Sequence, residues 1–186
     1  MKGKLIILSG PSGVGKDTVL EAWQRVNQKV RKVVSYTTRL PRTGEVEGAD
    51  YHFITHEAFE KLIEQNAFLE HKEVYGHYYG TPLHDMEELL NSGKFAVLKI
   101  DVQGALESIK KRPDAMTIFL LPPSFEELEH RIRSRGADSE EDIKKRLSKT
   151  SWELSQSSHY QYQVVNDTID QAVARLEEVF KRSLEV

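Results

Sequence analysis

The stretch of sequence that decides the fold is KLIILSGPSGVGKD, residues 4–17. Lys4 to Ser9 is a short apolar run that predicts a buried strand. Gly10 to Lys16 fits the phosphate-loop pattern, in which two glycines flank four residues and a lysine follows. Glycines let successive backbone N–H groups curl around phosphate oxygens, and the lysine reaches the terminal phosphates. The apolar residues after Lys16 recur at helical spacing, so the segment predicts a phosphate site between a strand and a helix.

The rest of the chain alternates between strand-like and helix-like segments. Further strands are predicted at 32–35, 51–54, 68–79, 95–100, 117–121 and 163–165. Helices are predicted at 57–65, from 81, at 103–111, from Ser124 to about 135, from Asp138 and from Thr168. A stretch rich in Arg, Gly and Glu, 37–50, is expected to be a loop or a small excursion from the core. The alternation predicts an α/β fold whose central parallel sheet has helices on both faces.

Composition excludes several classes of protein. A chain of 186 residues suits one domain, and the lack of cysteine rules out disulfides, thiolate metal sites and cysteine nucleophiles. The 29 acidic and 26 basic residues give a net charge of −3, which argues against a nucleic-acid or membrane-surface binder. The longest apolar runs are far shorter than the roughly 18 residues that cross a bilayer. We expect a soluble cytoplasmic protein, and the sequence leaves its oligomeric state open.

Further motifs follow the phosphate loop in order. They are SYTTRLPRTGE (35–45), GADYHF (48–53), YYGT (78–81), IDVQG (100–104) and VND (165–167). In this order the motifs resemble the guanylate kinase family over nearly the whole chain. The resemblance implies a single P-loop kinase domain with a small GMP-binding subdomain and a helical lid. It assigns 1–34, 83–125 and 151–186 to the core, 35–82 to the subdomain and 126–150 to the lid.

The resemblance also implies the reaction, which is phosphoryl transfer from ATP to GMP, and to dGMP, with Mg²⁺. Its ATP-binding residues fall on Gly10, Pro11, Ser12, Gly13, Val14, Gly15, Lys16, Asp17, Thr18 and Asn166. Asn166, which the family places near adenine, is alternatively a turn former at the end of a strand. The family's catalytic cations fall on Lys16, Arg39, Arg131, Arg135 and Arg146, the last three in the lid.

The GMP-binding residues implied by the resemblance are Ser35, Arg39, Arg42, Glu45, Tyr51, Glu70, Tyr79, Thr81 and Asp101. The chemistry of these residue types agrees with that role. Forked guanidinium donors at Arg39 and Arg42 suit a phosphate better than lysine does. A carboxylate at Glu70 accepts from the N1–H and the exocyclic amine of guanine, whereas adenine presents a bare N1 lone pair. Glu73 is a nearby alternative for this carboxylate.

Two positions depart from the family pattern. Asp17 stands where a serine or threonine hydroxyl is expected on Mg²⁺, and Lys99 stands where an acid is usual, two residues before Asp101. A carboxylate is itself a legitimate Mg²⁺ ligand, so Asp17 is a candidate metal ligand. We hypothesise a coupled exchange: either Asp17 and Lys99 pair when no nucleotide is bound, or Asp17 takes over the metal role. The alternative is two unrelated differences with Lys99 in solvent.

Two other functions compete with a guanylate kinase. One is a guanylate-kinase-like interaction module that grips a phosphorylated partner without catalysis, and the other is a related P-loop kinase with another phosphorylated acceptor. Interaction modules of this kind typically lose the phosphate-loop lysine and the lid arginines, which this chain keeps. A kinase for another acceptor is expected to lack the base-reading pair Glu70 and Thr81. ATP and GMP are therefore the expected partners.

Overall fold

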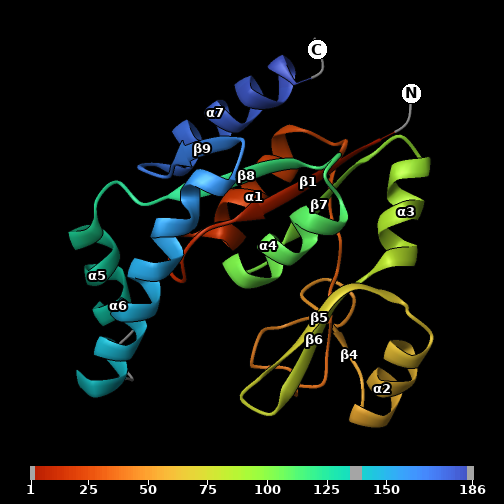
Figure 1. Cartoon of the computed structure of the whole chain (residues 1–186). Helices are drawn as coiled ribbons and strands as arrows, with labels where there is room; N and C mark the ends of the chain where they lie inside the picture. Colours follow the sequence, from red (N-terminus) through yellow and green to blue (C-terminus); the bar gives the residue numbers. More distant parts are fainter. Residues whose placement is uncertain (1–2, 135–139, 184–186) are drawn as a thin grey trace.

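The computed structural model describes residues 3–134 and 140–183. Within them, a central five-stranded sheet has the order β2-β7-β1-β8-β9 (Figure 1). Its strands are β1 Lys4–Ser9, β2 Val30–Lys32, β7 Phe95–Lys99, β8 Met116–Leu121 and β9 Tyr162–Val165. Every neighbouring pair is parallel. The predicted α/β fold class is confirmed.

Helices cover both faces of the central sheet. The helices α1 (Lys16–Val26) and α7 (Ile169–Arg182) pack on one face, and α3 (Leu83–Asn91) and α4 (Val102–Lys111) on the other. Side chains alternate along a strand, so Ile6 and Leu8 join the first layer while Leu5 and Ile7 join the second. Burial on both faces explains why β1 is a continuous apolar run.

A second, four-stranded sheet lies to one side of the central sheet, in the order β4-β3-β6-β5 (Figure 1). It consists of β3 Tyr36–Thr37, β4 His52–Phe53, β5 Phe68–Val74 and β6 His77–Pro82, with helix α2 (His56–Glu64) between β4 and β5. A turn at Tyr75 and Gly76, both with positive φ, joins β5 to β6 as a hairpin. Phe59 of α2 stacks on Phe68 with ring centroids 4.5 Å apart. This unit has its own small aromatic core.

The helices α5 (Phe125–Ser134) and α6 (Glu140–Ser155) lie at another side of the central sheet, and a 3₁₀ turn, Gln156–His159, follows them (Figure 1). Ser124 Oγ accepts from the backbone N–H of Glu127 at 3.1 Å, which confirms the predicted cap of α5. The predicted cap at Asp138 lies outside the described residues.

Several boundaries differ from the sequence-based expectation, most of them by one residue. Strand β2 is Val30–Lys32 rather than 32–35, because pairing with β7 places Val30 opposite Phe95, where it is fully buried. Strand β6 continues through Pro82, so α3 begins at Leu83, two residues later than expected. The 3₁₀ turn has no apolar periodicity that would have predicted it.

Candidate active site

The phosphate loop joins β1 to α1 at the carboxyl edge of the central sheet. Gly10, Gly13 and Gly15 have φ of 151°, 84° and 97°, values that side chains disfavour, so glycine is required for this curl. Lys16 Nζ turns back over the loop and donates to the carbonyls of Gly10 at 2.6 Å and Pro11 at 3.0 Å. Burial of this ammonium lowers the pKa of Lys16 to about 8, opposed by the nearby Glu153 carboxylate.

Two buried side chains hold this loop from distant parts of the chain. Asn166 Nδ2 donates to the Val14 carbonyl at 2.8 Å. Glu153, only 2% exposed on α6, accepts from the Ser12 N–H at 3.2 Å. Asn166 therefore positions the loop, whereas its place beside adenine stays a prediction. Glu153 was not expected from the sequence, because an acidic residue on a helix ordinarily faces solvent.

The predicted ATP-binding residues fall into two groups. In the loop, Val14 is fully buried in the core and Pro11 is also buried, whereas Ser12 is exposed. Asp17 and Thr18 lie exposed in the first turn of α1, directly after Lys16. The structure brings the loop, Lys16 and Asn166 together at one place.

A cavity of about 80 Å³ lies between the two sheets. Four predicted GMP-binding residues line it, namely Ser35, Tyr51, Glu70 and Tyr79. Glu70 is 4% exposed, and Thr81 Oγ1 donates to its Oε1 at 2.6 Å. Burial raises the pKa of Glu70, and the hydrogen bond from Thr81 opposes that shift. The cavity thus contains a fixed, buried acceptor, and Glu70 rather than the exposed Glu73 provides it.

Arg39 is held in place beside this cavity. Its guanidinium donates to both carboxylate oxygens of Glu45, at 2.9 and 2.8 Å, and lies 5.6 Å from the ring centroid of Tyr51. Hydrogen bonding from Arg39 lowers the pKa of Glu45 to about 2. Tyr51 packs edge-on against Tyr79 at 5.9 Å between centroids. Arg42 is exposed and reaches Glu45 through its backbone N–H at 2.7 Å.

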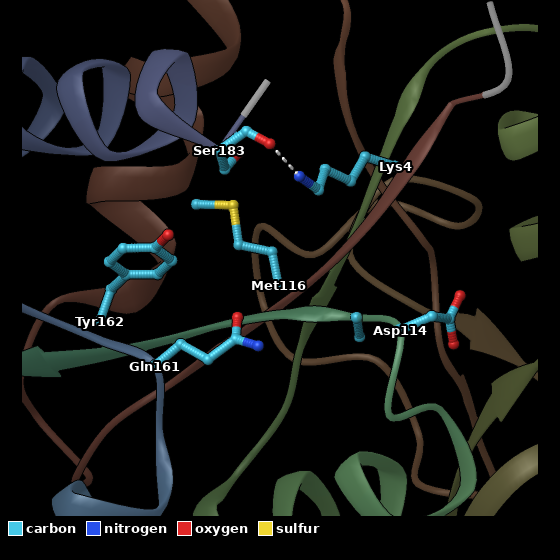
Figure 2. Close-up of a pocket in the computed structure, with 7 residues that line it drawn as sticks. Lys4, Asp114, Met116, Gln161, Tyr162 and Ser183 are labelled. Carbon is cyan, nitrogen blue, oxygen red and sulfur yellow. Dashed lines mark hydrogen bonds between the residues drawn. The ribbon is translucent and has the colours of Figure 1, made fainter. Parts of the chain in front are cut away.

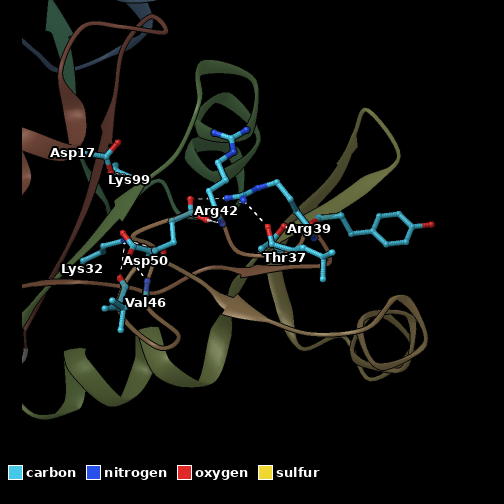
Figure 3. Close-up of polar contacts among 12 residues, drawn as sticks. Asp17, Lys32, Thr37, Arg39, Arg42, Val46, Asp50 and Lys99 are labelled. Carbon is cyan, nitrogen blue, oxygen red and sulfur yellow. Dashed lines mark hydrogen bonds and ion pairs between the residues drawn. The ribbon is translucent and has the colours of Figure 1, made fainter. Parts of the chain in front are cut away.

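Asp17, in the first turn of α1, and Lys99, at the end of β7, form an ion pair (Figure 3). Lys99 is the last residue of β7, and its side chain is 14% exposed, so it does not lie in solvent. The structure shows the Asp17–Lys99 contact that one arm of the coupled-exchange hypothesis assumes, and the coupling itself stays a prediction. Asp101 is also engaged, since it accepts from Gly104 N–H at 3.0 Å and pairs with Lys72.

These pairings bear on Mg²⁺. Asp17 and Asp101, the carboxylates on this side of the phosphate loop, already have lysine partners, and an ammonium and a divalent ion compete for the same oxygens. Across residues 3–134 and 140–183, no cluster of three or more His, Asp or Glu side chains is placed to hold a metal. The donors therefore do not fit a divalent ion held by the protein alone, and Asp17 as a metal ligand stays a prediction.

The lid arginines are placed in part. Arg131 on α5 donates to Glu127 at 2.8 Å, and Arg146 lies exposed on α6. Arg135 lies outside the described residues. Helix α5 borders the phosphate loop, because a Cβ added at Gly13 would contact Leu128 and Ile132 at 3.5 and 3.6 Å. Catalytic roles for the three arginines stay predictions.

A larger cavity of about 500 Å³ lies at the opposite edge of the central sheet (Figure 2). It is lined by the first residues of three strands, Lys4, Met116 and Tyr162, and Lys4 Nζ donates to the Ser183 carbonyl there at 2.5 Å. Ligands of open α/β sheets bind at the carboxyl ends of the strands. The small cavity beside the phosphate loop is therefore the candidate active site.

A phosphate loop between the first strand and helix of a parallel sheet, beside a cavity containing a buried acid, defines the class of P-loop phosphotransferases. A family model described as guanylate kinase matches residues 2–183. The chain belongs to the guanylate kinase family.

Individual relatives agree with this family. A guanylate kinase of Clostridium perfringens (strain SM101 / Type A) is 46% identical over 178 residues, which cover 96% of this chain and 82% of the relative. One from Caldanaerobacter subterraneus is 47% identical over 175 residues, covering 94% and 85%. The crystal structure of guanylate kinase from Anaplasma phagocytophilum aligns with a TM-score of 0.78 at 32% identity, covering 98% of this chain and 86% of that one. Shikimate kinase from Bacteroides thetaiotaomicron, at 16% identity and a TM-score of 0.55, shares the fold.

Proposed function

We propose that this protein transfers the γ-phosphoryl group of ATP to the phosphate of GMP, giving ADP and GDP. The observation that carries the proposal is the buried pair of Glu70 and Thr81 at a cavity that is also lined by Lys99, the ion-pair partner of Asp17 directly after the phosphate loop. The fixed carboxylate can accept from two guanine donors, and the loop supplies the donor-phosphate site. The two sites meet at the carboxyl edge of one sheet.

The transfer itself needs positioning and positive charge. An anionic oxygen of the GMP phosphate attacks the γ-phosphorus, and the bond from that phosphorus to the β,γ-bridging oxygen breaks. No general base is required, because a phosphate monoester is already ionised near pH 7. Lys16 offsets negative charge on the donor side, and Arg39 holds the acceptor phosphate. In the proposal, Arg131, Arg135 and Arg146 complete the set when the lid closes, and closure excludes water.

The proposal extends to cofactor, organisation and location. Mg²⁺ is proposed to enter on the phosphates of ATP. Residues 35–82, which contain the whole second sheet, are proposed as the GMP-binding unit, and 126–150 as the lid. Among the described helices, none has the length and apolarity that spanning a bilayer requires. A cytoplasmic location is part of the proposal.

The test is an acceptor panel with ATP as donor, containing GMP, dGMP, AMP, UMP and ribose phosphates, with ADP formation as the readout. We expect turnover of GMP and dGMP and at least about 10⁴-fold weaker use of AMP. Turnover of a different acceptor would indicate a related kinase. Binding of GMP without turnover of any acceptor would favour the interaction module and contradict the proposal.

A further inference from the structure

Lys99 lies between the donor and acceptor sites. Its side chain lines the 80 Å³ cavity together with Glu70 and Tyr51. Its ammonium contacts Asp17, the residue directly after Lys16 of the phosphate loop (Figure 3). The Lys99 side chain therefore lies next to both the proposed GMP cavity and the start of α1 after the phosphate loop.

The backbone beneath Lys99 is fixed to the start of the phosphate loop. Lys99 pairs with Leu8 in the parallel register of β7 and β1. The next residue is held twice, because the Ser9 hydroxyl donates to the Ile100 carbonyl at 3.0 Å and the Ile100 N–H donates to the Leu8 carbonyl at 3.3 Å. The position of the Lys99 side chain relative to the loop is therefore set by the sheet.

The Lys99 ammonium has capacity for further acceptors. Its side chain is 14% exposed while that of its partner Asp17 is 69% exposed, so the cation faces inward and the carboxylate faces solvent. An ammonium carries three donors, and within 3–134 and 140–183 the hydrogen bond from Lys99 goes to one acceptor, Asp17. Lys16 and Lys32 are its like-charged neighbours along the cleft. A row of lysines beside two nucleotide sites favours a polyphosphate.

We propose that Lys99 contacts the phosphates when both nucleotides are bound, and that Asp17 holds its ammonium in the free protein. This inference rests on the proposed function. It also follows from the poor fit of Asp17 to a protein-held divalent ion, because Lys99 supplies a fixed positive charge at that point. Binding of the phosphate chain should consequently persist without a divalent cation, and Asp17 should compete with the phosphates for Lys99.

The test measures binding by calorimetry in excess EDTA, with a bisubstrate probe in which five phosphates link adenosine to guanosine. Lys99→Met should weaken binding of this probe about 10- to 100-fold, the range for losing a hydrogen bond between charged groups. Binding of GMP alone should change less, because GMP has a single phosphate. Lys99→Arg should recover most of the loss, and Lys29→Met, an exposed lysine before β2, is the matched control. Lys99→Gln gives a second neutral variant if Lys99→Met folds poorly.

Asp17→Asn tests the competition. In EDTA it should strengthen probe binding several-fold when Lys99 is present, and should give a clearly smaller gain in the Lys99→Met background, where only the direct repulsion between Asp17 and the phosphates is relieved. Unchanged probe affinity in both neutral Lys99 variants, or an equal effect of Asp17→Asn in both backgrounds, would overturn the inference. Failure of the proposed function looks different, because the unmodified protein would then neither bind the probe nor phosphorylate GMP.

Discussion

Replacing Glu70 with glutamine tests base recognition with little change in shape. Glutamine keeps one carbonyl acceptor for the Thr81 hydroxyl, which now donates at 2.6 Å, but it replaces the second acceptor with an NH₂ donor. Against guanine, the variant loses a hydrogen bond to a charged group, about 1.5–3 kcal/mol, and leaves two donors facing each other in a buried site, about 1–3 kcal/mol. The low end is about 2.5 kcal/mol, so kcat/KM for GMP should fall at least about 70-fold.

The same substitution should not weaken the fold. Burial raises the pKa of Glu70 above its unfolded value, so folded stability declines as pH rises from that value through the raised pKa. Glutamine carries no charge, and the melting temperature at pH 7 should stay equal or rise.

The assay is kcat/KM for GMP and AMP with ATP, plus thermal unfolding. Glu73→Gln, exposed and on the opposite face of β5, is the control and should leave both readouts unchanged. GMP use within about threefold of the unmodified protein in Glu70→Gln would refute base recognition by this carboxylate.

Three further predictions concern the groups around the site. Since the pKa of Lys16 is about 8, kcat/KM for ATP should fall as pH rises through that value. Glu153→Gln should move this decline to lower pH, because the Glu153 carboxylate raises the pKa of Lys16. A pH–rate profile that the variant leaves unmoved would contradict this role of Glu153. The pKa of Glu45 is about 2 when folded and 4.5 in its ordinary range, so its ion pair stabilises fully above 4.5 and is lost as pH falls toward 2. Glu45→Gln should lower the free energy of unfolding in urea by about 1 kcal/mol at pH 7, and should flatten its dependence on pH between 4.5 and 2. An unaltered pH dependence would show that the Glu45–Arg39 pair does not cause it. Asn166→Ala should lower the free energy of unfolding by about 1–3 kcal/mol, because it leaves the Val14 carbonyl of the phosphate loop unpaired. The variant should also raise the KM for ATP more than the KM for GMP. Equal rises in the two KM values would show that Asn166 does not act through the loop.

The parts of the fold that were predictable are those where one local cause dominates. Burial on both faces makes Leu5 to Leu8 apolar throughout, and the positive φ of the loop requires glycine at Gly10, Gly13 and Gly15. Strand β2 was misplaced because its register depends on β7, more than sixty residues away in the sequence. Local pattern contains no information on that partner.

The residues of the candidate site also divide into those that the sequence indicated and those that it did not. The Asp17–Lys99 pair was foreseen because each residue is unusual at its position, so two anomalies suggested one contact. Glu153 and Lys72 gave no such signal, since charged residues on helices and strands ordinarily face solvent. Their contacts with Ser12 and Asp101 arise only when α6 and β5 fold against the core. Long-range polar contacts of this kind require the tertiary structure.

The most direct test of the whole account follows the phosphoryl group itself, with γ-³²P-labelled ATP and GMP as substrates. The account predicts that the label appears in the β-phosphate of GDP, one for each ADP formed, and that Lys16→Met slows this transfer about 100-fold or more. Label released as inorganic phosphate, or an unchanged rate in Lys16→Met, would contradict the transfer of phosphoryl between two nucleotides at this site.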